Sequence, residues 1–351
     1  MGDAALLLVG TRTSIQRAGR GRGIEPFWLT DGVARPADTV VPLTNPSFVV
    51  VNQRRDRVYC AHGDGSTVSS LAIDAATGAM QVTGEQPCGG TNPVHLEISP
   101  DERTLYVANH GVGSVGVVRL GETGAVAELI QTVVLTGTPG PDATNQPSSR
   151  PHGVLVTRSG NALLIADKGT DRLECFRLRQ DGTLEDAPAG VSVLPPGSGP
   201  RHIVEHPVLP VVYSVDEMAC TVTAHAFDLE AGVLEAFDAV STVAPETSGR
   251  VVAAEIALDP TGRHLYASTR GSDTVVHIEV DPGTGGLGAA DWTDTRGVCP
   301  RHFLAAFDRD ELYVANEYSH TIEAFQIDDA GRLSHRTRLA EVGSPTCLVL
   351  L

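Results

Sequence analysis

Six segments of this chain follow one plan, and this internal repeat constrains the fold more than any other feature. Each segment has a proline, an alternating apolar strand, a polar turn and a second strand of the Leu-Tyr-Val-Ala type, with Ala254 at the proline position of the fifth. The anchor positions 46, 93, 151, 200, 254 and 300 are 46 to 58 residues apart. This period is typical of a four-stranded propeller blade. Period-2 alternation, β-branched residues and Gly/Asp/Asn turns indicate strands throughout.

The two ends of the chain complement each other. The last residues, S-P-T-C-L-V-L-L, match the first strand of the unit with Pro345 as anchor, whereas A-L-L-L-V-G-T-R near the start matches the second strand. Joined, they make a seventh unit and close a ring, which removes exposed sheet edges. A solenoid would instead need polar capping repeats. We therefore predict an all-β, seven-bladed β-propeller, a single domain over residues 1–351, whose last blade is closed by the N- and C-terminal strands.

Composition narrows the class of partner. The formal net charge of −17 disfavours nucleic acid and anionic membrane, because both need a basic surface. It leaves open an anionic small molecule, since a local group of arginines can reverse the field within a cleft. We expect no membrane association and leave a homo-oligomer open.

The cysteines and the N-terminus bear on the cellular compartment. Six cysteines are scattered without a C-x-x-C pair, which is typical of reduced core thiols rather than a zinc site or a disulfide framework. The start, M-G-D-A-A-L-L-L-V-G, lacks the basic segment of a secretion signal, and no run approaches the ~20 apolar residues of a membrane helix. A cytoplasmic location is expected.

The predicted fold gathers distant polar residues at one mouth of the ring. The first strand of each blade lines the channel, so residues just after the anchors should converge there. Residues at the ends of the second strands should form another polar set. The first set is His95, His152, Arg201, His202, Glu255, Arg301 and His302, and the second is Asn109, Asp167, Glu217, Arg270 and Glu317.

Several motifs then coincide with one known family. G-P-R-H at 199–202, D-K-G-T-D at 167–171 and R-G-S-D at 270–273 occur in the right blades. In this respect the chain resembles the lactonase family of seven-bladed β-propellers, which includes propeller-type 6-phosphogluconolactonases and carboxymuconate cyclases. The resemblance runs from Pro46 to the end. It implies a catalytic site made of His152, Arg201, Glu217 and Arg270.

These residue types suit the opening of a lactone. Fixed guanidinium groups at Arg201 and Arg270 can stabilise a developing oxyanion or bind a substrate carboxylate or phosphate. His152 or Glu217 can take the proton from water, and Glu217 can alternatively act as the partner of His152. The same groups could run the reverse reaction, which closes a lactone on a muconate double bond.

A further set is predicted to bind substrate, and other polar residues are assigned to structure. The substrate-binding set is Arg150, Asn109, Glu255, Arg301 and His302. Asp167 and Asp171 are expected to bind backbone N–H groups in a turn, and His95 and His202 to be structural. Neither a metal nor another cofactor is expected, because the interleaved arginines would repel a cation such as Ca²⁺.

The chain departs from the family at three places near the expected mouth. Arg150-Pro151-His152 replaces the usual His-x-His, Arg12 stands in G-T-R-T where relatives have tyrosine, and the basic run R-A-G-R-G-R-G follows at 17–23. We interpret that run as a mobile loop. The proline-rich loop at 137–151 should overhang the mouth.

Three functions remain open from the sequence. The first is a lactonase that hydrolyses an anionic lactone, with the lactone or its open acid as the small-molecule partner. The second is a carboxymuconate-type cyclase, and the third is a non-catalytic propeller that binds a ligand or a protein. A scaffold alone would not need titratable and cationic groups together in its channel, which favours an enzyme.

Overall fold

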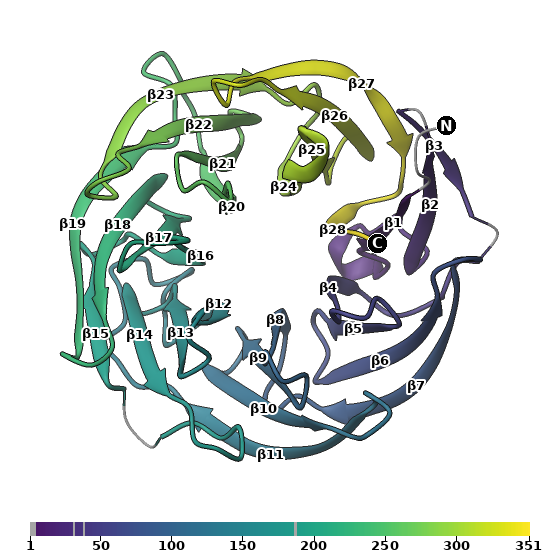
Figure 1. Cartoon of the computed structure of the whole chain (residues 1–351), viewed down its shortest axis with the longest axis horizontal. Coiled ribbons are helices and arrows are strands. Elements are labelled where there is room, and N and C mark those ends of the chain that lie inside the picture. The colour runs from purple at the N-terminus through teal and green to yellow at the C-terminus, as the bar shows by residue number, and fades with distance from the viewer. Residues whose placement is uncertain (1–4, 31, 38, 186–187) are drawn as a thin grey trace.

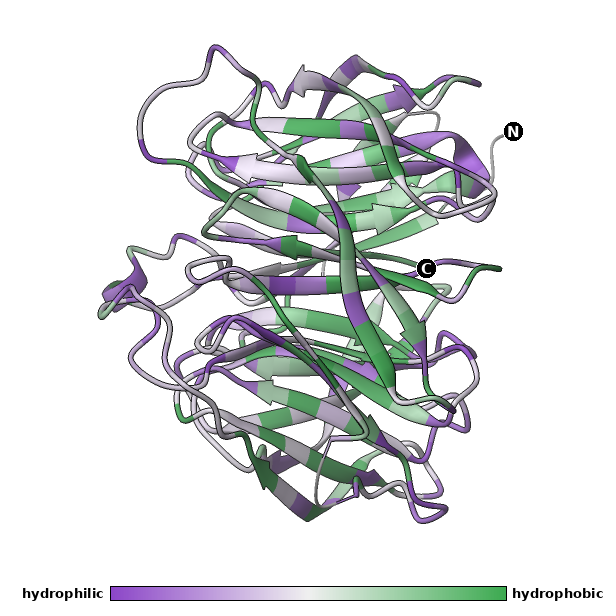
Figure 2. Cartoon of the chain, turned by 90° about the vertical axis from the view of Figure 1, so that its left-hand side faces the viewer, coloured by the Kyte–Doolittle hydropathy of each residue, from purple (hydrophilic) through white to green (hydrophobic). Residues whose placement is uncertain are grey.

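Seven four-stranded antiparallel sheets stand around one axis in the computed structural model, which describes residues 5–30, 32–37, 39–185 and 188–351 (Figure 1). In six of the sheets the strands follow one another in chain order from the axis outward. Alternating apolar residues make these strands, and glycine and aspartate turns end them. Figure 2 shows hydrophobic residues along the strands and hydrophilic ones mainly in the loops at both ends.

The strands of the first four blades have the following bounds. They are β4 (Pro46–Val51), β5 (Arg57–His62), β6 (Thr67–Asp74) and β7 (Ala79–Pro87); β8 (Pro93–Ile98), β9 (Thr104–Asn109), β10 (Ser114–Leu120) and β11 (Val126–Val134); β12 (Pro151–Val156), β13 (Ala162–Asp167), β14 (Arg172–Arg177) and β15 (Gly190–Val193); and β16 (Pro200–Glu205), β17 (Val211–Asp216), β18 (Thr221–Asp228) and β19 (Val233–Ser241).

The remaining three blades complete the ring. They are β20 (Val252–Leu258), β21 (His264–Arg270), β22 (Thr274–Val280) and β23 (Leu287–Asp294); β24 (Pro300–Ala306), β25 (Glu311–Asn316), β26 (Thr321–Ile327) and β27 (Leu333–Glu341); and β28 (Pro345–Leu350), β1 (Ala5–Thr11), β2 (Ile24–Thr30) and β3 (Val33–Pro36). Two short 3₁₀ helices, η1 (Ile15–Arg17) and η2 (Phe307–Arg309), interrupt the loops. No helix among the described residues has the length and hydropathy needed to cross a membrane.

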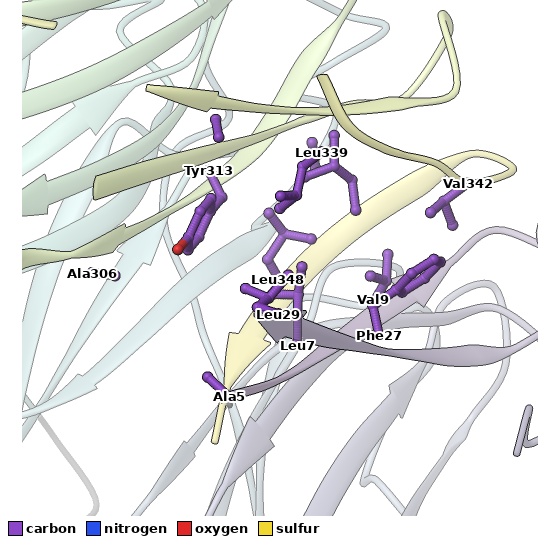
Figure 3. Packing of buried hydrophobic residues seen from close by; sticks show 13 residues of the cluster. Ala5, Leu7, Val9, Phe27, Leu29, Ala306, Tyr313, Leu339, Val342 and Leu348 are labelled. Atoms are coloured by element: carbon purple, nitrogen blue, oxygen red, sulfur yellow. The ribbon is translucent and has the colours of Figure 1, made fainter. Parts of the chain in front are cut away.

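The ring closes as predicted, by pairing its two ends. The C-terminal strand β28 lies antiparallel to β1, with Leu8 opposite Val349 and Gly10 opposite Cys347. Figure 3 shows Leu7 and Leu348 of this blade packing with Tyr313 of the sixth blade. Residues more than 300 positions apart in the chain therefore share one sheet and one core.

One anchor of the predicted repeat is wrong by one residue. In the second blade Pro93 pairs with Asn109, and in the fifth Ala253, not Ala254, pairs with the equivalent Thr269. The fifth segment has no proline to mark its start, so the sequence did not define its register. Glu255 consequently stands two residues after its anchor, in the position of His202 rather than of Arg201.

In four blades the tyrosine of the Leu-Tyr-Val-Ala motif makes a hydrogen bond to the next blade. Tyr59, Tyr106, Tyr213 and Tyr266 are almost fully buried. Each donates its hydroxyl hydrogen to a glycine carbonyl in the outer hairpin of the following blade, at 2.7–3.0 Å. A buried hydroxyl needs such a partner, so the repeated tyrosine is an inter-blade bracket.

Removing one of these inter-blade hydrogen bonds should lower the free energy of unfolding measurably. In Tyr213→Phe the hydroxyl is removed and the carbonyl of Gly285 loses its donor, at a cost of about 1–2 kcal/mol in the free energy of unfolding. Urea unfolding followed by fluorescence measures the change. The control is Tyr318→Phe, since Tyr318 is 67% exposed and its hydroxyl meets water. Equal stabilities of the two variants would contradict the bracket.

Candidate active site

A β-bulge at the start of each inner strand builds the channel lining. In blade four Pro200 pairs with Asp216 and His202 with Val215, so Arg201 between them has no partner on the neighbouring strand. The same shift occurs in the other blades. Consecutive residues of a regular strand point to opposite faces, and a bulge re-aims them. Arg201 Nη1 and His202 Nδ1 accordingly lie only 3.3 Å apart.

This register defines three rings of residues around the channel. Each ring consists of the residues that occupy one and the same position in the seven blades. The mouth ring, directly after the second strands, is Gly63, His110, Lys168, Glu217, Arg270, Glu317 and Arg12. The middle ring, at the bulged residue, is Ser47, Val94, His152, Arg201, Ala254, Arg301 and Thr346. The floor ring, one residue deeper, is Phe48, His95, Gly153, His202, Glu255, His302 and Cys347.

The floor ring closes the channel with contacts between its members. His202 Nδ1 lies 2.7 Å from Glu255 Oε1, and His302 Nε2 lies 3.4 Å from Glu255 Oε2. The ring centroids of His95 and His202 are 4.8 Å apart, and those of Phe48 and His95 are 4.1 Å apart. Burial lowers the pKa of each of these histidines. The floor is therefore a packed layer of neutral imidazoles around one carboxylate.

Glu217 is held by three cations above this floor. Its carboxylate lies 2.7 Å from Lys168 Nζ, 3.5 Å from Arg201 Nε and 3.4 Å from Arg270 Nη2. Burial raises the pKa of Glu217, but the three cations, Arg270 foremost, outweigh it and lower the pKa well below its usual value. Glu217 is thus ionised, and its described partners are cations rather than His152.

Backbone carbonyls of one strand fix both guanidinium groups of this cluster. Arg201 donates from Nη1 to the carbonyl of Ala254, and Arg270 donates from Nη2 to that of Ala253 at 2.7 Å. The Nε of Arg270 is buried and has no hydrogen-bond partner among the described residues, and the buried Nε of Arg201 makes only the 3.5 Å ion-pair contact with Glu217. Burial and then the charge of Arg270 lower the pKa of Arg201 to about 9. The cluster presents oriented, incompletely used donors.

His152 stands in the middle ring, one blade before Arg201, whose charge acts on it. Its ring centroid lies 5.3 Å from that of His202 and 5.6 Å from that of His110. Its side chain is buried, and Nδ1 has no hydrogen-bond partner among the described residues. Burial, followed by the charge of Arg201, lowers the pKa of His152 well below the usual value. It is a neutral imidazole in a positive field.

A second group of the same kind lies on the other side of the mouth. Arg12 Nε is 2.8 Å from one carboxylate oxygen of Glu317, and Arg301 Nε is 3.7 Å from the other. The side chains of Arg12 and Glu317 are less than 10% exposed. The two groups together bring five cations to two carboxylates, so this part of the channel is positive although the chain has a net charge of −17. The cations are Arg12, Lys168, Arg201, Arg270 and Arg301, and the carboxylates are Glu217 and Glu317.

The structure does not bring every predicted residue to this cluster. Asn109 is fully buried and donates from Nδ2 to the carbonyl of Cys88 at 2.7 Å, in the connection between β7 and β8. Asp167 accepts from the backbone of Arg150 and Gly169, as expected of a turn residue. Glu255 and His302 lie in the floor, below the predicted substrate level.

Lys168 and His110 were missed by sequence reasoning. The predicted second set mixed two registers, because Asn109 and Asp167 pair with the anchors of their blades, whereas Glu217 and Arg270 come one register position later. The signal was present in the motif itself. Every mouth-ring residue follows the tyrosine position by four, as Glu217 follows Tyr213 and Lys168 follows Leu164.

The basic run at 17–23 is a folded strap, not a free loop. Gly21 N donates to the carbonyl of Arg12 at 2.9 Å, and Arg20 N donates to Ser344 Oγ at 3.1 Å. A Cβ on Gly19 would lie 2.6 Å from the Arg12 carbonyl oxygen, so the glycines permit this close approach. Arg17 pairs with Asp64 of the first blade.

Two loops and a cleft frame the mouth. The 137–151 loop packs on the third blade, where Gln146 Nε2 donates to the carbonyl of Lys168 at 2.8 Å. A cleft of ≈ 910 Å³ opens between the strap and the first blade, and neither His152 nor Arg201 lines it; Ser14, Arg17, Asn45, His62 and Asp64 are among its lining residues. No group of three or more His, Cys, Asp or Glu side chains in the described ranges is placed to hold a metal.

Fold and site together define a propeller whose channel ends in a buried, cationic pit with an imidazole. The chain belongs to the family described as "Lactonase, 7-bladed beta-propeller", whose model matches residues 6–350. The resemblance stated from the motifs is thereby confirmed.

Relatives across bacteria carry related names. The chain is 28% identical to the 6-phosphogluconolactonase of Bacillus subtilis over 88% of each chain, and 30% identical to that of Cronobacter sakazakii over 81% of each. Among solved structures, a putative 6-phosphogluconolactonase from Bacteroides fragilis superposes with a TM-score of 0.89 at 28% identity, covering 100% of this chain and 98% of that one. A periplasmic gluconolactonase from Pseudomonas aeruginosa also gives 0.89, at 25% identity and 99% coverage of both chains.

Neutralising Glu217 tests the charge arrangement without reference to activity. In Glu217→Gln three buried cations lose their counter-ion, which should lower the free energy of unfolding by about 3 kcal/mol or more. The matched control is Asp64→Asn, which breaks a solvent-exposed ion pair and should cost less than about 1 kcal/mol. Chemical denaturation of both variants measures the difference. Similar stabilities would contradict the described cluster.

Proposed function

We propose that this protein is a lactonase that adds water to the ester carbonyl of an anionic lactone, with 6-phosphogluconolactone as the first candidate substrate. One observation carries the proposal. Two guanidinium groups anchored on backbone carbonyls and gathered at one carboxylate stand in the channel lining with a neutral imidazole, His152, whose Nδ1 has no partner among the described residues. The names of the relatives support the same reaction class.

His152 is proposed as the general base. Glu217 is ionised but strongly stabilised as the anion by its three cations, so it has little tendency to take a proton. A neutral imidazole can accept one directly. When an anionic substrate binds, its charge offsets part of the positive field and raises the pKa of His152 towards the working pH, which favours proton transfer.

The reaction then follows in two steps. The oxygen of water attacks the ester carbonyl carbon while one water proton passes to the imidazole of His152. The carbonyl oxygen becomes an oxyanion, which Arg201 and Arg270 stabilise from fixed positions. As the carbonyl re-forms, the ring C–O bond breaks, and the same proton goes to the leaving alkoxide. The product is the open hydroxy acid.

Glu217 is proposed to position the two arginines, and Lys168 to balance the charge of Glu217. Glu217 contacts both arginines and holds them near each other, and Lys168 offsets part of its negative charge. The arginines thereby keep their orientation before substrate arrives, so little reorganisation is needed during reaction.

A panel of lactones tests the function directly. Purified protein in weak buffer should release acid from 6-phosphogluconolactone well above the spontaneous rate, with carboxymuconolactone and gluconolactone offered in parallel. His152→Ala should lower kcat by about 10²–10⁴-fold, and Arg201→Ala by about 10²–10³-fold. The exposed mouth-loop variant Arg250→Ala is the control and should be unaffected. Turnover of every lactone only at the spontaneous rate would refute the proposal for this panel.

The pH profile tests the role of His152. Burial and neighbouring cations lower its pKa below 6.5, and the neutral form is the active one. Activity is therefore lost only as pH falls through this lowered pKa, and kcat/KM should stay level from pH 7 down to pH 6. In Lys168→Met one of the positive charges acting on His152 is gone, and the acid limb should move to higher pH. Half-loss of wild-type kcat/KM at or above pH 6.5 would argue against His152 as base.

A further inference from the structure

The cluster around Glu217 has a structural counterpart two blades further along the ring. In register, Arg201 and His202 correspond to Arg301 and His302, Glu217 corresponds to Glu317, and Arg270 corresponds to Arg12. The sequence shows the same relation, P-R-H followed by V-D-E in one blade and by A-N-E in the other. The mouth therefore contains one Arg–Glu–Arg arrangement twice.

The contacts of the two groups are alike. Arg201 Nε lies 3.5 Å from Glu217 Oε2, and Arg301 Nε lies 3.7 Å from Glu317 Oε2. In each group an arginine of the next blade contacts the same carboxylate, from Arg270 in the first and from Arg12 in the second. Glu317, like Glu217, is buried and shared between two guanidinium groups.

One difference separates the groups chemically. The first has His152 in the middle ring of the preceding blade, and the equivalent position of the second is Ala254. The second group thus has no counterpart of the middle-ring imidazole of His152. It has the parts for binding an anion and lacks the base for acid–base chemistry.

The second group carries excess positive charge. The single carboxylate of Glu317 faces the two guanidinium groups of Arg12 and Arg301. Arg12 contacts it through Nε, and its two terminal nitrogens make no hydrogen bond to the described residues. Burial, then the charge of Arg301, lowers the pKa of Arg12 to about 10. The charge of Arg301 also lowers the pKa of Arg201, so the two groups act on each other electrostatically.

The backbone holds Arg12 in place from both sides. Its N–H donates to the carbonyl of Ser344 at 3.0 Å, and its carbonyl accepts from Gly21 N at 2.9 Å. The next residues are tied as well, because Thr13 N and Ser14 N both donate to Asn45 Oδ1 at 2.9 Å. The backbone directly after β1 is therefore fixed where the Arg12 side chain begins, and Glu317 holds its guanidinium group.

We propose that Arg12 and Arg301 form a second anion subsite, which Glu317 holds in the free protein, and that the substrate is a lactone with a permanent anion, phosphate or carboxylate, away from its reacting carbonyl. This inference rests on the proposed lactonase function. Arg201 and Arg270 serve the carbonyl, while Arg12 and Arg301 bind the distal anion. Guanidinium groups suit both anions, because their paired N–H donors match two oxygens at once.

Two variants separate this role from a structural lock between the sixth and seventh blades. Binding of inorganic phosphate and of 6-phosphogluconate is measured by calorimetry, with gluconate as the reference that lacks the phosphate. Arg12→Gln should weaken 6-phosphogluconate binding by about tenfold or more and leave gluconate binding unchanged. Glu317→Gln takes away the carboxylate that competes for the site, so 6-phosphogluconate should bind several-fold more tightly. The control is Arg17→Gln, which removes an arginine of the strap that pairs with Asp64 instead of Glu317, and it should leave the binding of 6-phosphogluconate unchanged.

Opposite effects of the two variants on affinity support the subsite. If Arg12→Gln and Glu317→Gln both lower the melting temperature and weaken binding alike, the group is a lock and the proposal fails. Unchanged binding in a folded Arg12→Gln variant also overturns it. Because product binding needs no turnover, this test gives an answer even if the lactone panel fails.

Kinetics distinguish the kind of anion. For 6-phosphogluconolactone, Arg12→Gln should raise KM by about tenfold with little change in kcat, and for neutral gluconolactone it should change neither. The same KM effect confined to carboxymuconolactone assigns the subsite to a carboxylate. Loss of turnover in His152→Ala together with unchanged KM in Arg12→Gln for both anionic lactones leaves the lactonase intact and removes the subsite.

Discussion

The β-bulge after the first residue of each inner strand is the constraint on which the site depends. An unbulged strand would send alternate residues into the sheet interface, and only one of each neighbouring pair would reach the axis. With the bulge, Arg201 and His202 both face the channel, as their 3.3 Å contact shows. The shift recurs in every blade, so the ring acquires two inward layers where a plain sheet would supply one. The pit is thus a property of backbone register before it is a property of side chains.

The fold could be predicted well from the sequence because several independent signals mark the same repeat. Prolines mark six of the seven anchors, tyrosines mark five of the seven second strands, and the two apolar ends complement each other, so any one signal could be lost without losing the ring. The fifth blade shows where redundancy ends. It has no proline, and its bulge spans Ala253 to Ile256, so the position of Glu255 could not be assigned by counting from an anchor.

The site was harder to predict because neighbouring polar residues differ only in orientation. Asp167 and Lys168 are adjacent, yet the first binds the backbone of its own turn and the second reaches across to Glu217 in the next blade. Composition and motif do not separate such a pair; register does. Likewise Glu217 looked like a candidate base until its three cations were placed around it, since the identity of a carboxylate says nothing of its pKa.

The charged groups of the channel differ with depth, since the cations lie near the mouth and the neutral imidazoles lie in the floor, and this order has a physical reason. Ions far from water are costly unless paired, and the cost rises with burial. The floor accordingly has imidazoles kept neutral by burial around Glu255, whereas the guanidinium groups lie in the two rings nearer the mouth, where Glu217 and Glu317 divide them into two groups. Two carboxylates do not balance five cations, so an incoming anion meets unused donors rather than a neutral wall. Because the floor contains a carboxylate and neutral imidazoles rather than cations, an anion bound by those donors stops at the level of His152. The depth at which the cations end in the channel therefore sets the depth at which an anionic substrate can react.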